Sequence, residues 1–432
     1  MSRRKSTPSY LPHKQSGRAR AVWTDQTGIR HQKLLPGPFD SSESRTAFAR
    51  LQLEIETAPT GTVTDPDGIT VNEVMLAYLA HADRYYVDGE GKPTDEIVSI
   101  TRSIKPVREL YGNTTAAHFG PRALAAVRQH MIGLGWCRSL INKRIDRIRR
   151  AMKWAASEEL IPVATYEALR TLTGLRRGRT DARESEPVKP VADHFVEATL
   201  SHLPVHIRVM VELMMHTGMR PGEVCAMTLN QIDRTGKAWT YRPTRHKTAH
   251  HGKERVIPFG PKAHAVLVAF LHGRVLAPDA PVFSPRAARE ERHAKMREER
   301  KSKVQPSQLS RKKTKPKKQP AERYTTHTIT HAVRVAAEKA FPPPAPLAQQ
   351  EGETTAEWEA RLSNEEKAEL AQWRKTHHWH PYQLRHGYAT KARKLFGLEH
   401  AGAALGHTRM SATEVYAERD SQLAATVAAK IG

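Results

Sequence analysis

The sequence predicts a mainly α-helical protein with a small antiparallel β-sheet, divided into two folded domains. Three observations lead to this prediction. The 432 residues are enough for two to three domains of about 150 residues each. Apolar residues recur at i, i+3, i+4 and i+7 along several stretches after residue 65, as on one face of a helix. Two short runs, 238–242 and 255–259, have instead the composition of strands and lie on either side of a polar turn.

Composition excludes several classes of protein. Hydrophobic residues make up 39% of the chain, which excludes a wholly disordered protein. The two cysteines, Cys137 and Cys225, are too few for a disulfide scaffold or a cysteine-rich zinc site. No apolar run approaches the ~20 residues of a membrane span, and the basic start of the chain lacks the apolar stretch of a secretory signal. We therefore expect a soluble, cytoplasmic, nucleoid-associated protein that does not bind membranes.

Most of the positive charge lies in two segments. The net charge is 69 − 45 = +24. Residues 1–35 hold eight basic residues and one acidic residue, a net of +7, and residues 285–320 hold fourteen and four, a net of +10. Either both segments are solvated runs, or they bind a polyanion. Nucleic acid fits better than a membrane surface, because neither run has an interleaved apolar face.

The first folded domain is expected over residues 65–172. Residues 1–64 lack sustained periodicity and are rich in Pro, Gly, Ser and Arg, which predicts a mobile basic N-terminal arm. Order is expected to begin at Thr70, which forms a capping box with Glu73. Three more amphipathic stretches follow, the second of them starting at Pro121. The pattern therefore predicts a four-helix domain.

The fourth predicted helix, which follows Ser139, has a basic face. Six cations lie opposite its apolar residues, with Asp146 as the one acidic residue among them. Such a face is either solvated or follows the phosphates of a nucleic acid backbone. The candidate DNA-binding residues on it are Lys143, Arg144, Arg147, Arg150 and Lys153.

A linker and a second, larger domain follow. The polar stretch 173–192 has Pro and Gly near its ends and predicts a linker. The second domain then runs over 193–432. Two segments of it are interpreted as insertions: the basic tract at about 285–322, and about 342–375, which is first Pro-rich and then acidic and helical.

Four short motifs of the second domain stand out together. HTGMRPGEV places Arg220 at a helix start, where backbone N–H groups also attract anions. RHKTAHHGKERVIPF places Lys247 on a hairpin, and PYQLRHGYAT places Arg385 near another helix start. ALGHTRMSATEVYAERD contains His407 and, nine residues later (416 − 407), Tyr416. Each motif alone is more often structural, so the prediction depends on their joint order and spacing.

This order resembles that of the tyrosine recombinase, or phage integrase, family. The intervals are also similar: 27 residues from Arg220 to Lys247 (247 − 220) and 22 from Arg385 to His407 (407 − 385). The resemblance covers about residues 193–432, the catalytic domain. It extends more weakly to the predicted helical domain, which is similar to the SAM-like core-binding domain of the family. It implies a site-specific DNA recombinase or integrase, of the kind that mobile elements carry.

The resemblance implies roles for the cationic residues of these motifs. Arg220 and Arg385 would hold the non-bridging oxygens of the scissile phosphate, and Glu223 would support Arg220. Guanidinium groups suit this task because they are planar, permanently charged and bind phosphate oxygens in pairs. With two arginines and a lysine present, no metal is needed to clamp the phosphate. We therefore expect no cofactor.

The resemblance also assigns the covalent step. Lys247 would protonate the 5′ oxygen, His407 would contact the scissile phosphate, and Tyr416 would attack to give a 3′-phosphotyrosine. The covalent link conserves the energy of the phosphodiester bond, so that strands can be rejoined without ATP.

One position departs from the family pattern. The third box usually reads His-x-x-Arg, and Tyr382 stands where that histidine is expected, with His380 two residues earlier. Either the Tyr382 phenol donates to a phosphate oxygen, or a local shift brings in His380. His377 and His378 complete a histidine cluster, but it lacks a Cys or carboxylate partner at ligand spacing, so no metal site is expected.

Two other interpretations compete with a recombinase. One is a DNA-binding homologue without activity, but retention of both arginines, Lys247 and Tyr416 argues against it. The other is a type IB topoisomerase, which the N-terminal helical domain and the Gly-His-to-Tyr spacing disfavour. The resemblance implies double-stranded DNA with a specific recombination site as the partner, bound by four protomers. Three apolar positions near the C-terminus either pack into a neighbouring protomer or fold onto their own core, namely Leu423, Val427 and Ile431.

Overall fold

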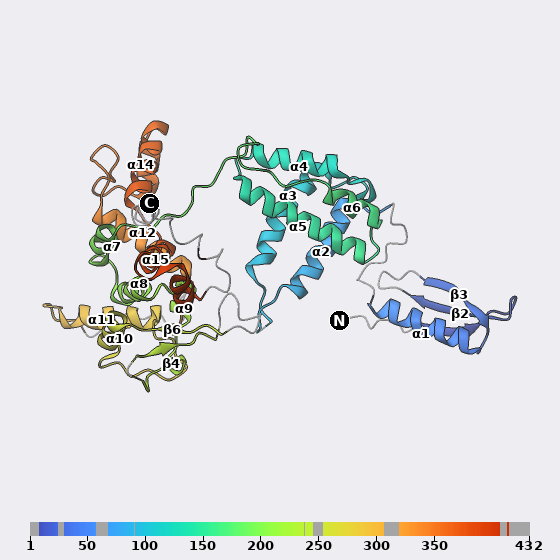
Figure 1. Cartoon of the computed structure of the whole chain (residues 1–432), viewed down its shortest axis with the longest axis horizontal. Coiled ribbons are helices and arrows are strands. Elements are labelled where there is room, and N and C mark those ends of the chain that lie inside the picture. Colours follow the sequence, from blue (N-terminus) through green and yellow to red (C-terminus); the bar gives the residue numbers. More distant parts are fainter. Residues whose placement is uncertain are drawn as a thin grey trace, which may run out of the picture. The chain divides into compact units, whose positions relative to one another are not determined.

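The structure is a computed structural model of the whole chain (Figure 1). It describes residues 8–24, 30–57, 68–89, 91–236, 238–244, 254–305, 319–406 and Thr413. The chain divides into two compact units, Met1–Glu186 and Pro187–Gly432, and the division lies within the segment expected to be a linker. Both units are mainly helical with a small antiparallel sheet, which confirms the predicted fold class.

The N-terminal segment folds into a sheet with a helix, so the prediction of a mobile arm over residues 1–64 is wrong for the part that the structure describes. The elements are β1 (Ser9–Pro12), β2 (Arg18–Thr24), β3 (Arg30–Pro38) and α1 (Ser42–Thr57). The strands pair antiparallel in the order β1-β2-β3, and α1 packs against β3. Their core is small and centres on Ala19, Ala21, Leu35 and Leu51. Burying these side chains is what fixes the sheet to the helix.

The rest of the first unit is a helical bundle. Its elements are α2 (Val71–Tyr85), α3 (Asp95–Tyr111), a short 3₁₀ turn (Ala116–His118), α4 (Pro121–Gly133), α5 (Arg138–Ser157) and α6 (Val163–Arg170). The capping box predicted at the start of the bundle is present, because Glu73 N–H donates to Thr70 Oγ1 and Thr70 N–H donates to the Glu73 carboxylate. The predicted apolar faces form one core, in which Val71, Ile100 and Ile141 are fully buried.

Residues 172–183, which we call the strap, pack against this bundle. Arg128 Nη1 donates to Thr173 O at 2.8 Å, and the Arg138 backbone N–H donates to Arg183 O at 2.8 Å. The first half of the expected linker is therefore part of the helical unit. Beyond the strap, the Gln383 side chain of the second unit donates to Lys189 O at 3.0 Å.

The second unit contains the remaining elements. They are α7 (Asp193–Leu200), α8 (Val205–Thr217), α9 (Pro221–Ala226), a 3₁₀ turn (Leu229–Gln231), β4 (Ile232–Asp233), β5 (Thr240–Tyr241), β6 (Ile257–Pro258), α10 (Pro261–Leu271), α11 (Pro285–Glu298), α12 (Thr326–Ala340), α13 (Thr355–Arg361), α14 (Asn364–His377) and α15 (Tyr382–Leu405). Helix α8 lies in the core and packs against α10 and α15.

The small sheet of the second unit is tied to helix α9. Strand β5 pairs antiparallel with both β4 and β6. Tyr241 on β5 is fully buried, and its hydroxyl donates to Glu223 O of α9 at 2.8 Å. The sheet and the helix start that carries Arg220 are therefore held together by a buried hydrogen bond.

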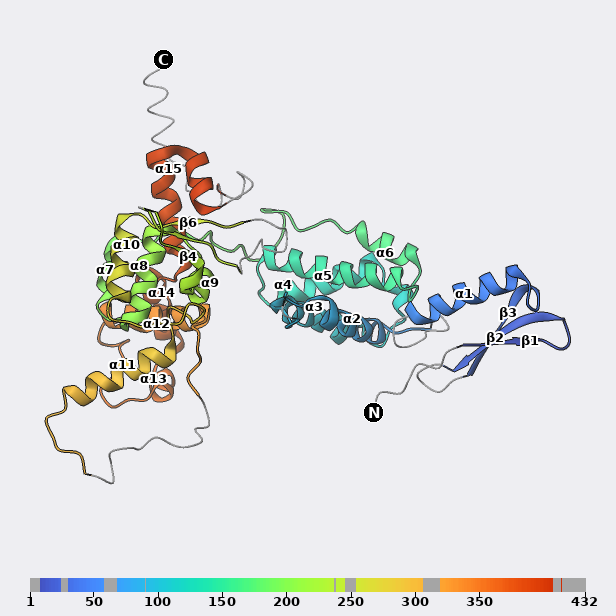
Figure 2. The same ribbon diagram turned by 90° about the horizontal axis from the view of Figure 1, so that it is seen from below.

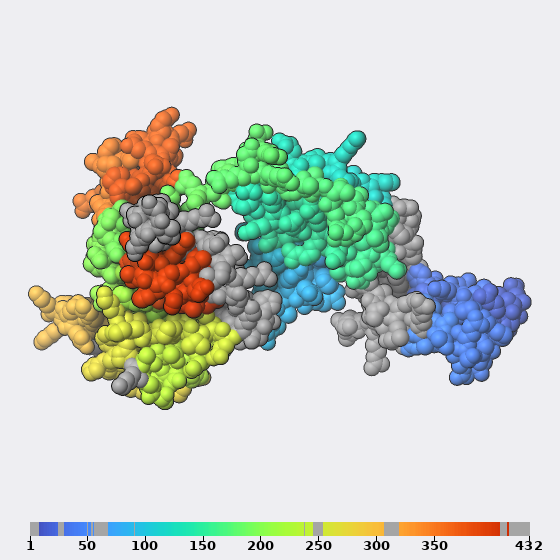
Figure 3. Space-filling model, viewed as in Figure 1, coloured from blue at the N-terminus to red at the C-terminus, as the bar shows by residue number. Residues whose placement is uncertain are grey.

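Both segments that are interpreted as insertions from the sequence contain helices: α11 lies in the first, and α13 and α14 lie in the second. Helix α11 has no buried residue and projects from the second unit in two views (Figures 2 and 3). It is attached through Glu291, which binds Arg274 on one side and the buried His206 on the other, at 2.9 and 3.2 Å. The segment 342–375 forms α13 and α14, which share a small cluster of Leu347, Trp358, Leu362 and Leu370.

No helix in the described part of the chain has the length and hydrophobicity needed to cross a lipid bilayer.

Candidate active site

The site is built at the end of helix α8. Gly218 caps that helix with a φ of +65°, a left-handed conformation that favours glycine. The ring of Tyr388 occupies the space next to it, and a Cβ at Gly218 would come within 2.5 Å of that ring. Both the backbone angle and the close ring require glycine here, which fixes the turn leading to Arg220.

Arg220 and Glu223 form a pair at the start of α9. The Arg220 backbone N–H donates to Glu223 Oε2 at 2.8 Å, and its side-chain Nη1 donates to Glu223 Oε1 at 2.7 Å. Glu223 is buried, and the Arg220 side chain is 17% exposed. Glu223 therefore caps the helix and holds the guanidinium with the same carboxylate; its supporting role in catalysis stays a prediction.

Arg385 lies in the first turn of α15 and is fully buried. Its Nη1 donates to Gly218 O at 2.6 Å and its Nη2 donates to Leu405 O at 2.8 Å. Leu405 is twenty residues away, about 30 Å along a straight helix. The two residues meet because α15 turns back at Gly397, where φ is +86° and ψ is 175°. Backbone carbonyls satisfy these N–H groups without neutralising the positive charge.

A third arginine, Arg255, belongs to the same cluster and was not among the residues that the sequence motifs singled out. It is 4% exposed, its Nη1 donates to Ala404 O at 3.2 Å, and its Nε lies 3.7 Å from Glu223 Oε1. A signal for it exists in the sequence, because Arg255, Ile257 and Phe259 alternate along the chain and all face inward. Burial lowers the pKa of the Arg255 guanidinium; Glu223 opposes this shift.

The described part of the site is strongly positive. Arg220 and Arg255 lie within 4 Å of the Glu223 carboxylate, and Arg385 adds a third guanidinium that is bonded to Gly218 O, so these four side chains carry a net charge of 3 − 1 = +2. Charges with this burial are weakly screened, so the cluster is suited to bind an anion such as a phosphate.

Three of the predicted catalytic residues lie outside the described residues: Lys247, His407 and Tyr416. The last described residues of helix α15 and its cap, Leu405 and Gly406, directly precede His407 in the sequence. The roles of these three side chains remain predictions from the motifs.

Tyr382 and His380 differ in exposure. Tyr382 is the first residue of α15, three positions before Arg385, and is 41% exposed. His380 is half-buried, and burial lowers the pKa of its imidazole. Its backbone N–H donates to the Gln383 side chain at 2.9 Å. The choice between these two residues for the box position remains a prediction.

The other histidines of that cluster have structural partners. His377 stacks on Trp373 with ring centroids 3.8 Å apart, and His378 pairs with Glu338 at 2.8 Å. Within the described ranges, no group of three or more His, Cys, Asp or Glu side chains is placed to hold a metal ion.

The candidate DNA-binding face of α5 is partly neutralised. Arg147 and Arg150 both pair with Glu96 of α3, at 2.8 and 2.9 Å. Hydrogen bonds from Arg147 lower the pKa of the Glu96 carboxyl, so it remains charged. Arg144 stacks on Trp136, 3.6 Å from the ring centroid. The exposed cations of this candidate face are Lys143, Arg150 and Lys153, and of these Arg150 is paired with Glu96.

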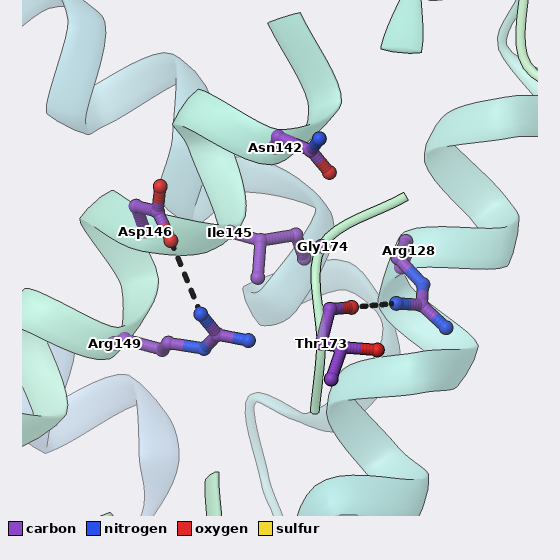
Figure 4. A pocket seen from close by; sticks show the side chains of 7 residues that line it. All are labelled: Arg128, Asn142, Ile145, Asp146, Arg149, Thr173 and Gly174. Atoms are coloured by element: carbon purple, nitrogen blue, oxygen red, sulfur yellow. Dashed lines mark hydrogen bonds and ion pairs between the residues drawn. The ribbon is translucent and has the colours of Figure 1, made fainter. Parts of the chain in front are cut away.

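The helical unit also contains a cavity of about 220 Å³ between α4, α5 and the strap (Figure 4). Arg128 and Arg149 reach it from the two helices. Arg128 donates to Thr173 O, and Arg149 pairs with Asp146 at 3.1 Å and donates to Leu172 O. These cations hold the strap, so the cavity serves the fold of this unit.

A comparison of the sequence with known protein families finds a match, and it lies within the second unit. Residues 191–342 match the Phage integrase family. That range contains Arg220, Glu223 and Arg255 and ends where the segment 342–375 begins. Over this range, about a third of the chain, the sequence is similar to that family. No curated protein sequence matches the chain.

Solved structures of integrases are similar to the chain as a whole. One is a lambda integrase dimer bound to a COC′ core site, with 15% identity, a TM-score of 0.51, and 97% of each chain covered. Another is the Tn1549 transposon integrase in complex with a circular intermediate DNA, with 12% identity and a TM-score of 0.53 over 84% of this chain and 99% of that one. At these identities the similarity shows a shared fold.

Proposed function

We propose that the protein is a site-specific DNA recombinase that cuts and rejoins strands through a 3′-phosphotyrosine at Tyr416. The observation that carries this proposal is the buried cluster of Arg220, Arg385 and Glu223. Its arginines are held by a carboxylate and by backbone carbonyls before any substrate is present. Such preorganised donors stabilise the charge that develops on a phosphate during transfer.

The reaction uses the chain's own groups. Arg220 and Arg385 bind the non-bridging oxygens of the scissile phosphate. The Tyr416 oxygen forms a new bond to phosphorus, the bond to the 5′ oxygen breaks, and Lys247 gives that oxygen a proton. His407 contacts the phosphate, together with either the Tyr382 hydroxyl or the His380 imidazole. Rejoining reverses these steps with the 5′ hydroxyl of another strand, so neither ATP nor a metal takes part.

The substrate is duplex DNA that contains a recombination site. Two observations support it: the excess of positive charge and the fold shared with integrases that were solved bound to DNA. Exchange between two duplexes cuts four strands, one for each protomer, so we propose four protomers on the DNA.

The test is covalent capture on a nicked suicide substrate. Tyr416→Phe should abolish the protein–DNA adduct and leave DNA affinity nearly unchanged, because only the nucleophilic oxygen is lost. Tyr388→Phe is the matched control, because its ring packs against Gly218 in the same unit and it should retain adduct formation. If adducts persist in Tyr416→Phe and vanish in Tyr388→Phe, the nucleophile is Tyr388.

The same preparations separate the alternatives. A recombinase exchanges strands between two sites, a type IB topoisomerase relaxes supercoiled plasmid without doing so, and an inactive homologue binds DNA but forms no adduct. A two-site recombination assay beside a plasmid-relaxation assay therefore distinguishes the three.

A further inference from the structure

Arg255 occupies a junction between two parts of the site. Its side chain reaches from the segment before β6 to Ala404 O at the end of α15, and its Nε faces Glu223 on α9. A Cβ on Gly406 would come within 2.4 Å of Arg255 Nη1. The guanidinium is therefore packed tightly against the residues that directly precede His407.

Two arginines compete for one carboxylate oxygen. Glu223 Oε1 accepts a hydrogen bond from Arg220 Nη1 at 2.7 Å, and Arg255 Nε lies 3.7 Å from the same oxygen, too far for a hydrogen bond. Within the described part of the chain, Arg255 Nε and Nη2 are buried and have no hydrogen-bond partner. A buried charged donor in this state is unfavourable, and a small movement of Glu223 would satisfy it.

We propose that Arg255 is a positioning residue that takes over Glu223 when Arg220 engages the scissile phosphate. This inference rests on the proposed function. Phosphate and Glu223 are both anions that attract the Arg220 guanidinium, so a carboxylate bound to Arg220 competes with the substrate. Arg255 removes that competition when its Nε–H donates a hydrogen bond to Glu223 Oε1. Glu223 Oε2 still caps α9 through the Arg220 backbone N–H.

The exchange also affects α15. Because Arg255 Nη1 holds Ala404 O, a shift of its guanidinium toward Glu223 acts on the helix end that leads to His407. Phosphate binding at Arg220 is thereby coupled to the position of Ala404 at the end of α15. The coupling runs through the contacts that join Arg220, Glu223, Arg255 and Ala404.

The experiment is a double-mutant cycle of Arg255→Met and Glu223→Gln, measured as the rate of adduct formation at saturating suicide DNA. Arg255→Met alone should slow the rate roughly 10-fold or more, the scale for a disturbed phosphate donor, with DNA affinity changed less than about 2-fold. Adding Glu223→Gln should restore part of the rate, because glutamine still caps the helix but no longer holds Arg220 by charge.

Controls separate positioning from folding. Arg274→Met removes another partly buried, ion-paired arginine of the same unit and should leave the rate unchanged. Thermal unfolding checks each variant, and where Arg255→Met does not fold, Arg255→Lys carries the test with the same expected rescue by Glu223→Gln.

Two results would overturn the proposal: an unchanged rate in the Arg255 variant, or a double variant slowed by the product of the two single effects. Absence of adducts in the wild-type protein would instead overturn the proposed recombinase function, so the two failures are distinguishable.

Discussion

The arginines of α5 and Arg385 of α15 were both predicted to bind phosphate, but the structure holds them in different ways. On α5, Arg147 and Arg150 share the carboxylate of Glu96 near the surface. In the second unit, Arg385 is fully buried and donates to two backbone carbonyls. A shared carboxylate cancels charge, whereas a carbonyl orients the guanidinium and leaves its charge available. Burial and the type of partner therefore distinguish a preorganised phosphate site from a basic surface.

The largest expected effect is at Arg385. Arg385→Met should reduce the rate of adduct formation by at least about 100-fold, because it removes a preorganised donor and a permanent charge. Arg385→Lys should also be deficient, since one ammonium group cannot span both carbonyls and a phosphate. Single-turnover cleavage measures the rate, and circular dichroism checks the fold. A lysine variant with wild-type activity would show that charge alone matters, and it would contradict the conclusion that the bonds from Arg385 to backbone carbonyls prepare the site for phosphate.

A smaller effect is expected at the exposed lysines of α5. If Lys143 and Lys153 each contact a phosphate, replacing both with glutamine should reduce the slope of log K against log salt by about 1.8. Arg147→Gln should change the slope less, because Glu96 already neutralises that charge. Binding to a duplex over a range of salt concentrations tests this. Equal slopes in all variants would mean that this face is only solvated.

The smallest expected effect concerns Glu96 itself. Glu96→Gln frees Arg147 and Arg150, so DNA affinity should rise a few-fold and the salt slope should increase by up to about 1.8. The lowered pKa of Glu96 means that its ion pairs stabilise the folded unit above about pH 4.5 and that this stabilisation is lost as the pH falls below that value. The stability deficit of Glu96→Gln should therefore shrink on acidification, as denaturant unfolding at several pH values would show.

The sequence pattern alone located those helices that begin with characteristic capping or first-turn residues. The capping box of Thr70 and Glu73 and the first-turn Pro121 each mark a helix start through a local hydrogen bond or a fixed backbone angle. Such signals depend on neighbouring residues, so one sequence is sufficient to read them.

The features that the sequence did not reveal depend on contacts between distant residues. Strand β2 was missed because its inward residues include Ala19 and Ala21, which give little apolar contrast and are poor strand formers. The return of Leu405 to Arg385 requires the turn at Gly397, and no periodicity predicts it. The alternation of Arg255, Ile257 and Phe259 could be recognised in the sequence, but the pairing of Arg255 with Glu223 depends on the tertiary fold.

The strap has a consequence for how the two units act on one DNA molecule. The chain is anchored at Arg183 O on one side and at Lys189 O on the other, so the tether between the units is six residues (189 − 183) and at most about 20 Å long. For a short tether, the effective concentration of the second binding event is of the order of millimolar. Once the helical unit has bound DNA, a catalytic unit with only micromolar affinity of its own would remain largely bound to the same duplex. On the proposed function, such a unit can hold its phosphate weakly and release a rejoined strand while the helical unit keeps the protein on the site.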